Sequence, residues 1–326
     1  MRPILVAHNA VAAGDDFSTQ DVLAQVGFVT AGLEALGAPY RVLAIDDRGV
    51  DAAAVDGADT VVNLVESPPG CPGFQVEAAE AFERLGLRIT GSSAAAIRAT
   101  TDKDATRRTL AASGVAVAPG GLLDPARPEV LDRVPAPWIL KPALEDASLG
   151  LDDGAVTSDR ERALERAREL DRLFPGQPVL VEHLLPGREF NIALLADESG
   201  LEVLPPAEMT YVDFPPDRPR ILGWEAKWDQ GSFAYRNTVR VFLNGSEGTL
   251  RSALEAVARR AWTACGLAGY GRVDIRLDES GAPCVLEVNA NPCISADAGF
   301  VAAAAAAGIQ PHEVVRRVLT AAGWRA

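Results

Sequence analysis

Short apolar runs alternate with amphipathic stretches over the first third of the chain. The apolar runs at 3–8, 40–46 and 60–66 are typical of strands, and 87–91 predicts a fourth. Residues 21–37 and 75–86 have helical periodicity and end in Gly. Strands and helices in this order predict a small parallel α/β layer. The first strand lacks a G-x-G-x-x-G fingerprint, so the pattern does not indicate NAD binding.

From about residue 94 the pattern changes to longer helices and longer strands. Helices are expected at 100–115, 159–174 and 249–265, with further helices in the Ala-rich tail. A strand is expected to end at Lys141-Pro142, and another at 178–197 to break at Pro186-Gly187. The whole chain is therefore expected to be a mixed α/β (α+β) protein of several units.

Residues 271–292, "GRVDIRLDESGAPCVLEVNANP", alternate apolar and polar positions on either side of a turn-forming run. A two-residue loop at Ser280-Gly281 would place Asp274 opposite Glu287 and Arg272 opposite Asn289. The other face would carry Val273, Ile275 and Leu277 with Val288, Leu286 and Cys284. Facing carboxylates repel each other, so this pairing predicts a cation between them, and the oxygen ligands suit Mg²⁺ or Mn²⁺. Surface ion pairs on a solvated face are the alternative.

Composition narrows the possible partners. Forty-eight per cent of the 326 residues are hydrophobic, which is enough for proper cores, and the net charge is −14. That charge argues against nucleic acid or an anionic membrane as the main partner. The four cysteines show no zinc-ligand or disulfide spacing, and no signal peptide or membrane-spanning run is evident. We therefore expect a cytoplasmic protein.

Three lysines lie where folding alone does not require them. Lys103 is in the first turn of a predicted helix, where a positive charge opposes the macrodipole. Lys141 ends an apolar strand, and Lys227 lies between two tryptophans in "GWEAKW". Each alone is most often a solvated surface lysine. Together with the paired carboxylates they are typical of a site that holds a triphosphate.

These segments resemble, in order and spacing, the ATP-grasp ligases, and specifically the D-alanine–D-alanine ligase-like branch. The resemblance covers nearly the whole chain through "VVNLVE", "LRITGSS", "WILKP", "VLVEHLLPGREFNIALL", "GWEAKW" and the 271–292 hairpin. It implies an N-terminal Rossmann-like (pre-ATP-grasp) domain at 1–93, a central ATP-grasp subdomain at 94–181 and a C-terminal subdomain at 182–326. The resemblance is also compatible with a homodimer.

The resemblance further implies roles for individual residues. Asp274, Glu287 and Asn289 match the ligands of Mg²⁺, and Arg272 with Lys227 matches the catalytic cations that steady the reacting groups. The positions that match the ATP site are Lys103, Lys141, Ser148, Glu182, His183, Leu184, Leu185, Glu189 and Lys227. A catalytic role for His183 is set aside, because the chemistry needs no histidine and its place in the linker favours packing or backbone contacts.

Several positions depart from the dipeptide-forming ligases. Their Gly-Ser-Ser run is here Asp146, Ala147 and Ser148, and the acid that holds the first ammonium is replaced by Thr19. Trp228 and Cys293 also stand where the family has Tyr and Gly. We therefore expect an ATP-dependent ligase that joins amino acids, or an amino acid and an amine, in secondary metabolism rather than cell-wall synthesis. A small-molecule phosphotransferase and a catalytically silent nucleotide-binding module are the alternatives.

Overall fold

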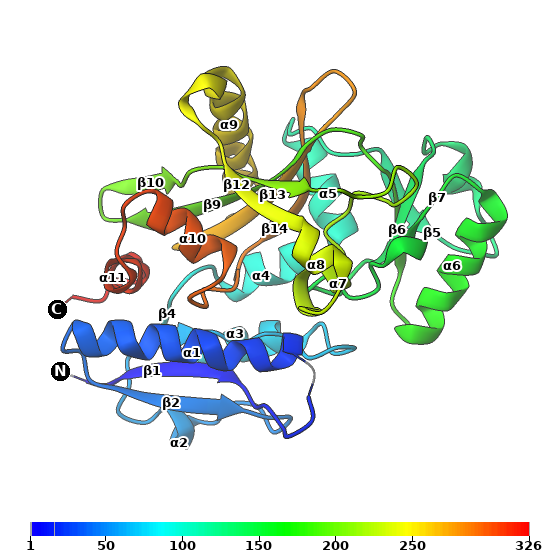
Figure 1. Ribbon diagram of the computed structural model, residues 1–326. Helices are drawn as coiled ribbons and strands as arrows, with labels where there is room; N and C mark the ends of the chain where they lie inside the picture. Colours follow the sequence, from blue (N-terminus) through cyan, green and yellow to red (C-terminus); the bar gives the residue numbers. More distant parts are fainter. Residues whose placement is uncertain (1, 16, 326) are drawn as a thin grey trace.

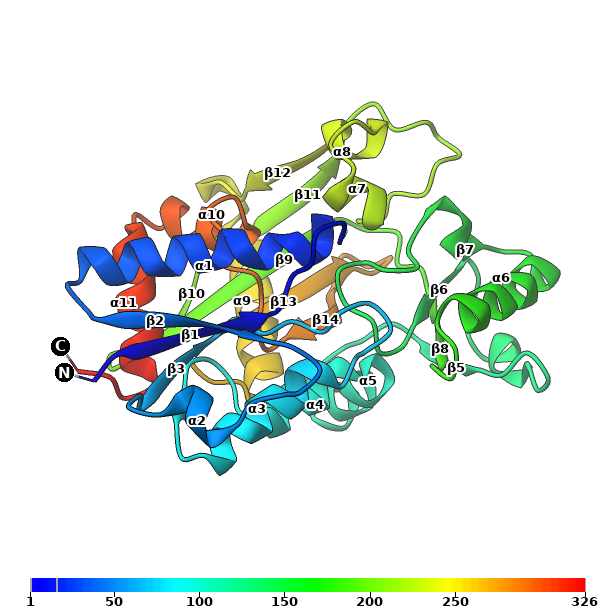
Figure 2. The ribbon, with the colours of Figure 1, turned by 90° about the horizontal axis from the view of Figure 1, so that it is seen from below.

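The computed structural model describes residues 2–15 and 17–325, and three β-sheets follow one another along this part of the chain (Figure 1). The first sheet is parallel, in the order β2 (Tyr40–Ile45), β1 (Ile4–Asn9), β3 (Thr60–Asn63), β4 (Arg88–Ile89). Alternate residues of β1 face opposite sides. Ile4 and Val6 pack with α1 (Phe17–Ala35), whereas Leu5 and Ala7 pack with α2 (Ala52–Val55) and α3 (Phe74–Arg84). Figure 2 shows α1 on one side of the strands and α2 and α3 on the other. The expected parallel α/β layer is confirmed.

The second sheet is antiparallel and has the order β5 (Gly120–Leu123), β8 (Val179–His183), β6 (Trp138–Pro142), β7 (Val156–Thr157). Two short 3₁₀ turns, η1 (Glu129–Asp132) and η2 (Asp153–Ala155), flank it. Helix α6 (Arg160–Leu173) begins after Asp159, whose side chain accepts hydrogen bonds from the first free N–H groups. Its apolar face packs Ala163, Ala167 and Leu170 against the sheet.

The third sheet joins β12 (Thr238–Phe242), β11 (Ala207–Tyr211), β9 (Glu189–Asp197), β13 (Tyr270–Leu277) and β14 (Pro283–Asn289), with β10 (Gly200–Val203) paired to β9. Its central strands β9 and β13 are largely buried, because helices cover parts of both faces, whereas β10 and β12 have exposed residues. One side holds α4 (Ala94–Thr101), α5 (Lys103–Ala112) and, after the 3₁₀ turn η3 (Gly245–Glu247), α9 (Gly248–Ala264). The other holds α10 (Gly299–Ala306) and α11 (Pro311–Ala321), and α11 also contacts α1, which joins this sheet to the layer of the first sheet.

The hairpin of β13 and β14 confirms the central pairing of the sequence prediction and corrects its details. Asp274 lies opposite Glu287, and Arg272 lies opposite Asn289. The turn, however, has three residues between Asp278 and Ala282, with Gly281 at φ +81°. That extra residue shifts the pairing near the turn, and a β-bulge at Leu286 restores it.

The shifted pairing changes the face on which two side chains lie. The two-residue loop places Leu286 and Cys284 on the apolar face with Val288, and both placements are wrong. Leu286 lines the pocket described below, and Cys284 lies opposite Arg276 and packs with Leu185. Val273, Ile275 and Val288 do lie in the core, as expected. None of the described helices is long and apolar enough to cross a membrane.

Candidate nucleotide and substrate site

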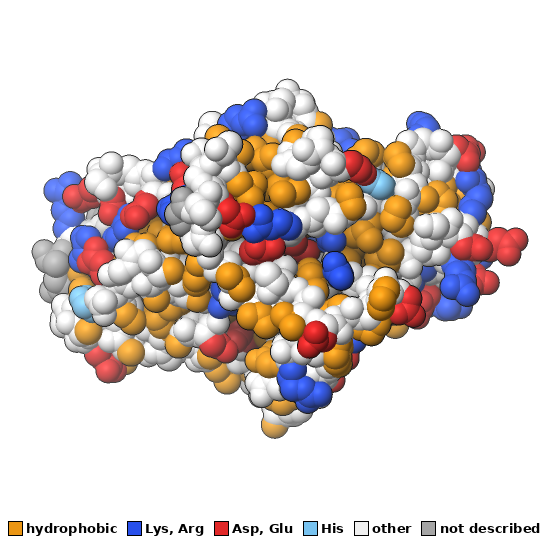
Figure 3. Space-filling view, turned by 45° about the horizontal axis from the view of Figure 1, so that its top comes forward, with side chains coloured by type: hydrophobic (Ala, Val, Ile, Leu, Met, Phe, Trp, Pro, Cys, Tyr) orange, Lys and Arg blue, Asp and Glu red, His pale blue; other side chains and the backbone are white. Residues whose placement is uncertain are grey.

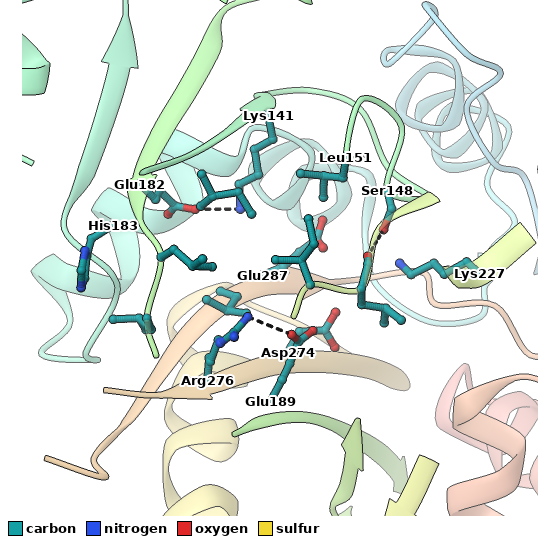
Figure 4. Close-up of a pocket in the computed structure, with 16 residues that line it drawn as sticks. Lys141, Ser148, Leu151, Glu182, His183, Glu189, Lys227, Asp274, Arg276 and Glu287 are labelled. Atoms are coloured by element: carbon teal, nitrogen blue, oxygen red, sulfur yellow. Dashed lines mark hydrogen bonds and ion pairs between the residues drawn. The ribbon is translucent and has the colours of Figure 1, made fainter. Parts of the chain in front are cut away.

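A pocket with an empty volume of about 660 Å³ lies between the second and third sheets (Figure 4). It brings together residues from β6, β8, β9, β13 and β14, from three connecting loops and from the short helix α7 (Trp224–Trp228). The site residues expected from the sequence that line it are Lys141, Ser148, Glu182, His183, Leu184, Leu185, Glu189, Lys227, Asp274 and Glu287. Of the remaining expected residues, Lys103 contacts Glu287, Arg272 contacts Asp274, and Asn289 lines a smaller neighbouring pocket.

Glu287 lies at the centre of the positive charges. Its carboxylate is 3.1 Å from Lys103 Nζ, and Figure 4 shows Glu287 between Lys141 and Lys227 in that view. Burial alone would raise the pKa of Glu287, but Lys103, Lys141, Lys227 and Arg272 lower it to about 2. The carboxylate is therefore ionised at any physiological pH.

Lys103 reaches the site because α5 begins with it. Asp102 caps the helix, and the lysine side chain runs back to contact Glu287, the backbone oxygen of Glu145 and, at 3.5 Å, Asp146. Burial favours a neutral amine, yet the attraction of Glu287 and Asp146 raises the pKa of Lys103 above its usual value. The oxygen contacts thus offset the unfavourable position at the positive end of the helix.

Asp274 is held rigidly from two sides. Arg272 donates to both of its carboxylate oxygens, at 2.8 and 2.9 Å, and Asn191 Nδ2 donates to Oδ1 at 2.8 Å. Such a bidentate pair fixes the orientation of both groups. Burial favours the neutral form of Arg272, but Asp274 more than compensates and raises its pKa.

Two further carboxylates belong to buried pairs at the rim of the pocket. Glu182 Oε2 lies 2.7 Å from Lys141 Nζ. Glu189 accepts hydrogen bonds from Tyr211 at 3.0 Å and from Arg276 at 3.3 Å, both through Oε2. Burial raises the pKa of Glu189 although Arg276 opposes the effect. Its Oε1 has no partner among the described residues, so this oxygen can accept a hydrogen bond from a ligand hydroxyl.

Two loops meet over the end of the pocket that Ser148, Leu222 and Lys227 line. The lid is residues 222–228, which include the short helix α7 (Trp224–Trp228), and it is followed by α8 (Phe233–Asn237). The phosphate loop is residues 145–151. Trp228 Nε1 donates to Ala147 O at 3.0 Å, Ser148 Oγ to Leu222 O at 2.9 Å, and Trp224 N to Leu151 O at 2.9 Å.

The lid and the phosphate loop approach each other closely, and the phosphate loop has a strained backbone. A Cβ at Gly223 would lie 2.6 Å from Leu151 O, so only glycine fits there. Ala147 and Ser148 adopt left-handed φ angles of 55° and 60°, a conformation that favours glycine. Lys227 extends from the closed lid into the pocket, where burial and Arg272 lower its pKa.

His183 has a structural environment. One ring nitrogen is 3.0 Å from Pro135 O, and the other is 2.9 Å from Glu279 in the hairpin turn. The ring therefore connects the second sheet to the turn of the third. This fits the packing role expected from the sequence better than a catalytic one.

A second group of polar residues lies beyond Arg272, where the first domain meets the 291–297 loop. Glu66 accepts a hydrogen bond from Gln25, and burial, together with the charges of Asp21 and Asp146, raises its pKa to about 7. The Cys293 thiol donates to Asp21 at 2.9 Å. Burial and these acids raise the pKa of Cys293, so it remains a thiol and is a poor nucleophile.

The residues present fit a hard divalent cation that is shared with phosphates. Asp274, Glu287 and Asn289 offer carboxylate and amide oxygens from adjacent positions of one hairpin, which is the ligand chemistry of Mg²⁺. The described residues contain no group of three His, Cys, Asp or Glu side chains that could hold a metal alone. Such a site would depend on phosphate oxygens to complete the coordination.

The sequence did not indicate the apolar walls of the pocket. Ile139, Leu151, Ile221 and Leu222 line it together with Leu286 and Arg276. The sequence of β6 does not show which of its faces points into the pocket, so it does not single out Ile139. Leu222, in the lid, has no feature that distinguishes it from other loop residues. Apolar walls of this kind suit the flat face of a nucleotide base.

Comparisons with known proteins agree with this geometry. The model of the family described as "D-ala D-ala ligase C-terminus" matches residues 124–320. A D-alanine–D-alanine ligase of Gloeobacter violaceus is 31% identical, covering 95% of this chain and 97% of that protein. A protein of Sinorhizobium fredii named y4sG, whose function is uncharacterized, is also 31% identical over 81% of this chain and 75% of its own length.

Solved structures show the same fold. The D-alanine–D-alanine ligase of Bacillus anthracis, crystallised with ATP, matches with a TM-score of 0.76 and 15% identity, covering 99% of this chain and 97% of that one. The ligase of Coxiella burnetii matches with a TM-score of 0.72 and 16% identity over 98% and 94% of the two chains. The chain belongs to the D-alanine–D-alanine ligase family, a family of ATP-dependent ligases with the ATP-grasp fold.

Proposed function

We propose that this ATP-dependent, amide-forming ligase joins two amino acids, or an amino acid and a related amine, through an acyl phosphate. One observation carries the proposal: Lys103, Lys141 and Lys227 surround Glu287 at one end of the pocket. Three cations and an ionised carboxylate there are suited to a triphosphate with its divalent cation. Family membership supports ATP as the nucleotide.

The proposed reaction has two steps. A carboxylate oxygen of the donor attacks the γ-phosphorus of ATP, the bond to the β-phosphate oxygen breaks, and ADP leaves. The neutral amine of the acceptor then attacks the acyl carbon, its nitrogen gives up one proton, and inorganic phosphate leaves with the bridging oxygen. Arg272 is placed to steady the negative charge on the donor, because Asp274 holds its guanidinium beside the pocket.

The nucleotide would lie with its base against the apolar walls and its phosphates toward the lysines. Glu182 and the backbone of His183, Leu184 and Leu185 are proposed to contact adenine, and the free oxygen of Glu189 a ribose hydroxyl. Ser148, held in the phosphate loop, is proposed to lie beside the phosphates. Mg²⁺ or Mn²⁺, held by Asp274, Glu287 and Asn289, would neutralise phosphate charge. The closed lid would exclude water that hydrolyses an acyl phosphate.

We further propose that the substrates are not a pair of D-alanines and that the product belongs to secondary metabolism. The substrate side of the pocket supports this, because it differs from the dipeptide-forming enzymes. Thr19 replaces their ammonium-binding acid, while Glu66 and Asp21 supply carboxyl groups from other positions. The similarity to y4sG, a protein without a characterised function, is in keeping with a specialised substrate.

Small molecules are the proposed partners, and the protein is proposed to act in the cytoplasm as a homodimer. On the face that Figure 3 shows, Lys and Arg side chains are interspersed with Asp and Glu, a distribution that does not favour nucleic acid. Light scattering of the purified protein would give its mass in solution. A monomer at all concentrations tested would contradict the dimer.

The decisive experiment measures what the release of ADP requires. The protein would be mixed with Mg²⁺-ATP and amino acids, singly and in pairs, with ADP, phosphate and condensed products detected by mass. A ligase releases ADP and phosphate in equal amounts and forms amide only when a donor and an amine are both present. A phosphotransferase would phosphorylate one compound alone, and a silent module would match its Glu287→Gln variant with every pair.

A further inference from the structure

Arg240 is an arginine without an anionic partner on the active face of the third sheet. Arg240 is on β12, opposite Met209 of β11. Across the sheet the same line of paired residues continues to Glu189 on β9 and Arg276 on β13, so these side chains share one face. The Nε of Arg240 is buried and has no hydrogen-bond partner, and no carboxylate among the described residues lies within ion-pair distance of its guanidinium. Arg240 is partly buried as a whole. The more deeply buried Arg276 and Arg317 differ from it, because each contacts a carboxylate.

The surroundings of Arg240 make its cation costly. Its guanidinium lies against Gly299, since a Cβ there would be 3.4 Å from Nη2 and 3.7 Å from Cζ. Gly299 is the first residue of α10, so the positive end of that helix faces a positive side chain. Burial and the nearby Arg272 lower the pKa of Arg240, and only Asp297, beyond ion-pair distance, opposes them.

This arrangement suits an incoming anion. An anion would complete the hydrogen bonds of the guanidinium, relieve its repulsion from Arg272 and complement the helix end. Gly299 contributes by leaving the space into which Arg240 extends. The phosphates of ATP are not that anion, because Arg240 does not line the nucleotide pocket. It interacts instead with Arg272 and Asp297, on the side where Cys293 and Glu66 lie.

We propose that Arg240 is a specificity-determining residue that binds an anionic group, a carboxylate or a phosphate, on the substrate that is not phosphorylated. The inference rests on the proposed ligase function and adds to it a requirement: the acceptor carries a negative charge apart from its amine. An uncharged amine would leave Arg240 unpaired and would bind less tightly.

The test compares acceptors that differ in one charge. The pairs are alanine with alaninamide, aspartate with asparagine, and phosphoserine with serine, each in both stereochemical forms. Binding is measured as the shift in melting temperature at millimolar concentration, with Mg²⁺ and a non-hydrolysable ATP analogue present. Where turnover is seen, KM for each acceptor is measured as well. The pair that responds identifies the anion as an α-carboxylate, a side-chain carboxylate or a phosphate.

Three variants are compared with the native protein. Arg240→Gln removes the charge and keeps most of the length, Arg240→Lys keeps a charge, and Arg236→Gln changes an exposed arginine that contacts only Gly231 O as a control. We expect the charged member of at least one pair to bind about tenfold more weakly to Arg240→Gln, with its neutral partner unchanged. Arg240→Lys should lie between, and Arg236→Gln should match the native protein.

Two outcomes would overturn the inference. In one, no charged compound binds the native protein better than its neutral partner. In the other, Arg240→Gln weakens both members equally, which would mean that Arg240 only supports the fold, for instance by pairing with Asp297. Neither outcome touches the ligase proposal, which fails separately if the native protein forms no amide from any donor and amine.

Discussion

Charged side chains are arranged differently on the two sides of Arg272. Toward the nucleotide, Lys103 and Lys141 each contact a carboxylate, and Glu287 is fully ionised among cations. Toward the substrates, Arg240 has no anion, and Glu66 is a buried acid whose pKa is raised to about 7. On the first side, two of the three lysines are paired with carboxylates before any ligand binds, as suits a ligand common to a whole family. The second side requires a ligand to balance its charges.

The largest expected effect on the comparison of the two sides comes from replacing Glu287. We expect Glu287→Gln to lower kcat by about a thousandfold or more, because it removes the charge that balances Lys103 and would hold the divalent cation. The fold should persist, as the amide fills the same space. Steady-state kinetics and circular dichroism would check both. Glu198→Gln, an exposed change in the β9–β10 turn, is the control. Native turnover in Glu287→Gln would end the metal interpretation.

Lys227 tests the lid. We expect Lys227→Ala to lower kcat about a hundredfold while changing the KM of the donor little, since its cation approaches the phosphates only from the closed lid. Trp228, which contacts the phosphate loop, should change its fluorescence when Mg²⁺-ATP and donor are added. An unaltered kcat, with fluorescence insensitive to ligands, would remove the support for a closing lid.

Lys141 tests the pairing on the nucleotide side. Lys141→Ala should weaken ATP binding by about 10-fold to 100-fold and also destabilise the protein by about 3 kcal/mol, because Glu182 is left buried without its partner. The double variant Lys141→Met, Glu182→Gln should recover most of the stability but not the affinity. Calorimetry of ATP binding and urea unfolding separate the two effects. Native affinity in Lys141→Ala would assign the lysine a purely structural role.

The pH dependence of stability tests Glu66 on the substrate side. Its pKa rises from 4.5 in the unfolded chain to about 7 in the fold, so its stabilising contribution is present below pH 4.5 and is lost as pH rises through about 7. Glu66→Gln keeps an oxygen for Gln25 and avoids the buried charge. It should therefore gain about 3 kcal/mol over the native protein at pH 8 and nothing at pH 4.5. Melting temperatures across this range would check the sign; an equal difference at both pH values would contradict it.

The smallest expected effect concerns the phosphate loop between the two sides. Ala147 has a φ of 55°, which glycine adopts without strain. We expect Ala147→Gly to stabilise the protein by up to about 1 kcal/mol, the relief of strain being partly offset by the greater freedom of glycine when unfolded. Ala111→Gly, within α5, should instead destabilise it by about 1 kcal/mol. Equal losses in both variants would show that the loop is unstrained.

The hairpin shows how far sequence alone could predict this site. Alternation identified both strands, and counting outward from the turn set Asp274 opposite Glu287. The loop length was wrong by one residue, and the bulge at Leu286 reversed that error before the site was reached. Bulges depend on packing against neighbouring strands, which the hairpin sequence does not contain.

Arg240 marks what could not be predicted. Lys103, Lys141 and Lys227 follow a family pattern, so their positions could be expected from the sequence. Arg240 lies on an edge strand beside an exposed Val239 and looks like an ordinary surface residue. Its importance depends on Gly299, which is 59 residues away in the chain and contacts it only after folding. The same holds for Glu66, whose acidic neighbours come from α1 and the phosphate loop.

The contacts between lid and phosphate loop bear on the order of events in each turnover. Hydrogen bonds made by Ser148, Trp224 and Trp228 tie the two loops together at three points. Passage of a nucleotide between the two loops would require these bonds to break. We expect ADP release to be slower than bond formation, so that a burst of product precedes the steady rate in rapid-mixing experiments. The turnover rate would then be set by the rate at which the lid separates from the phosphate loop.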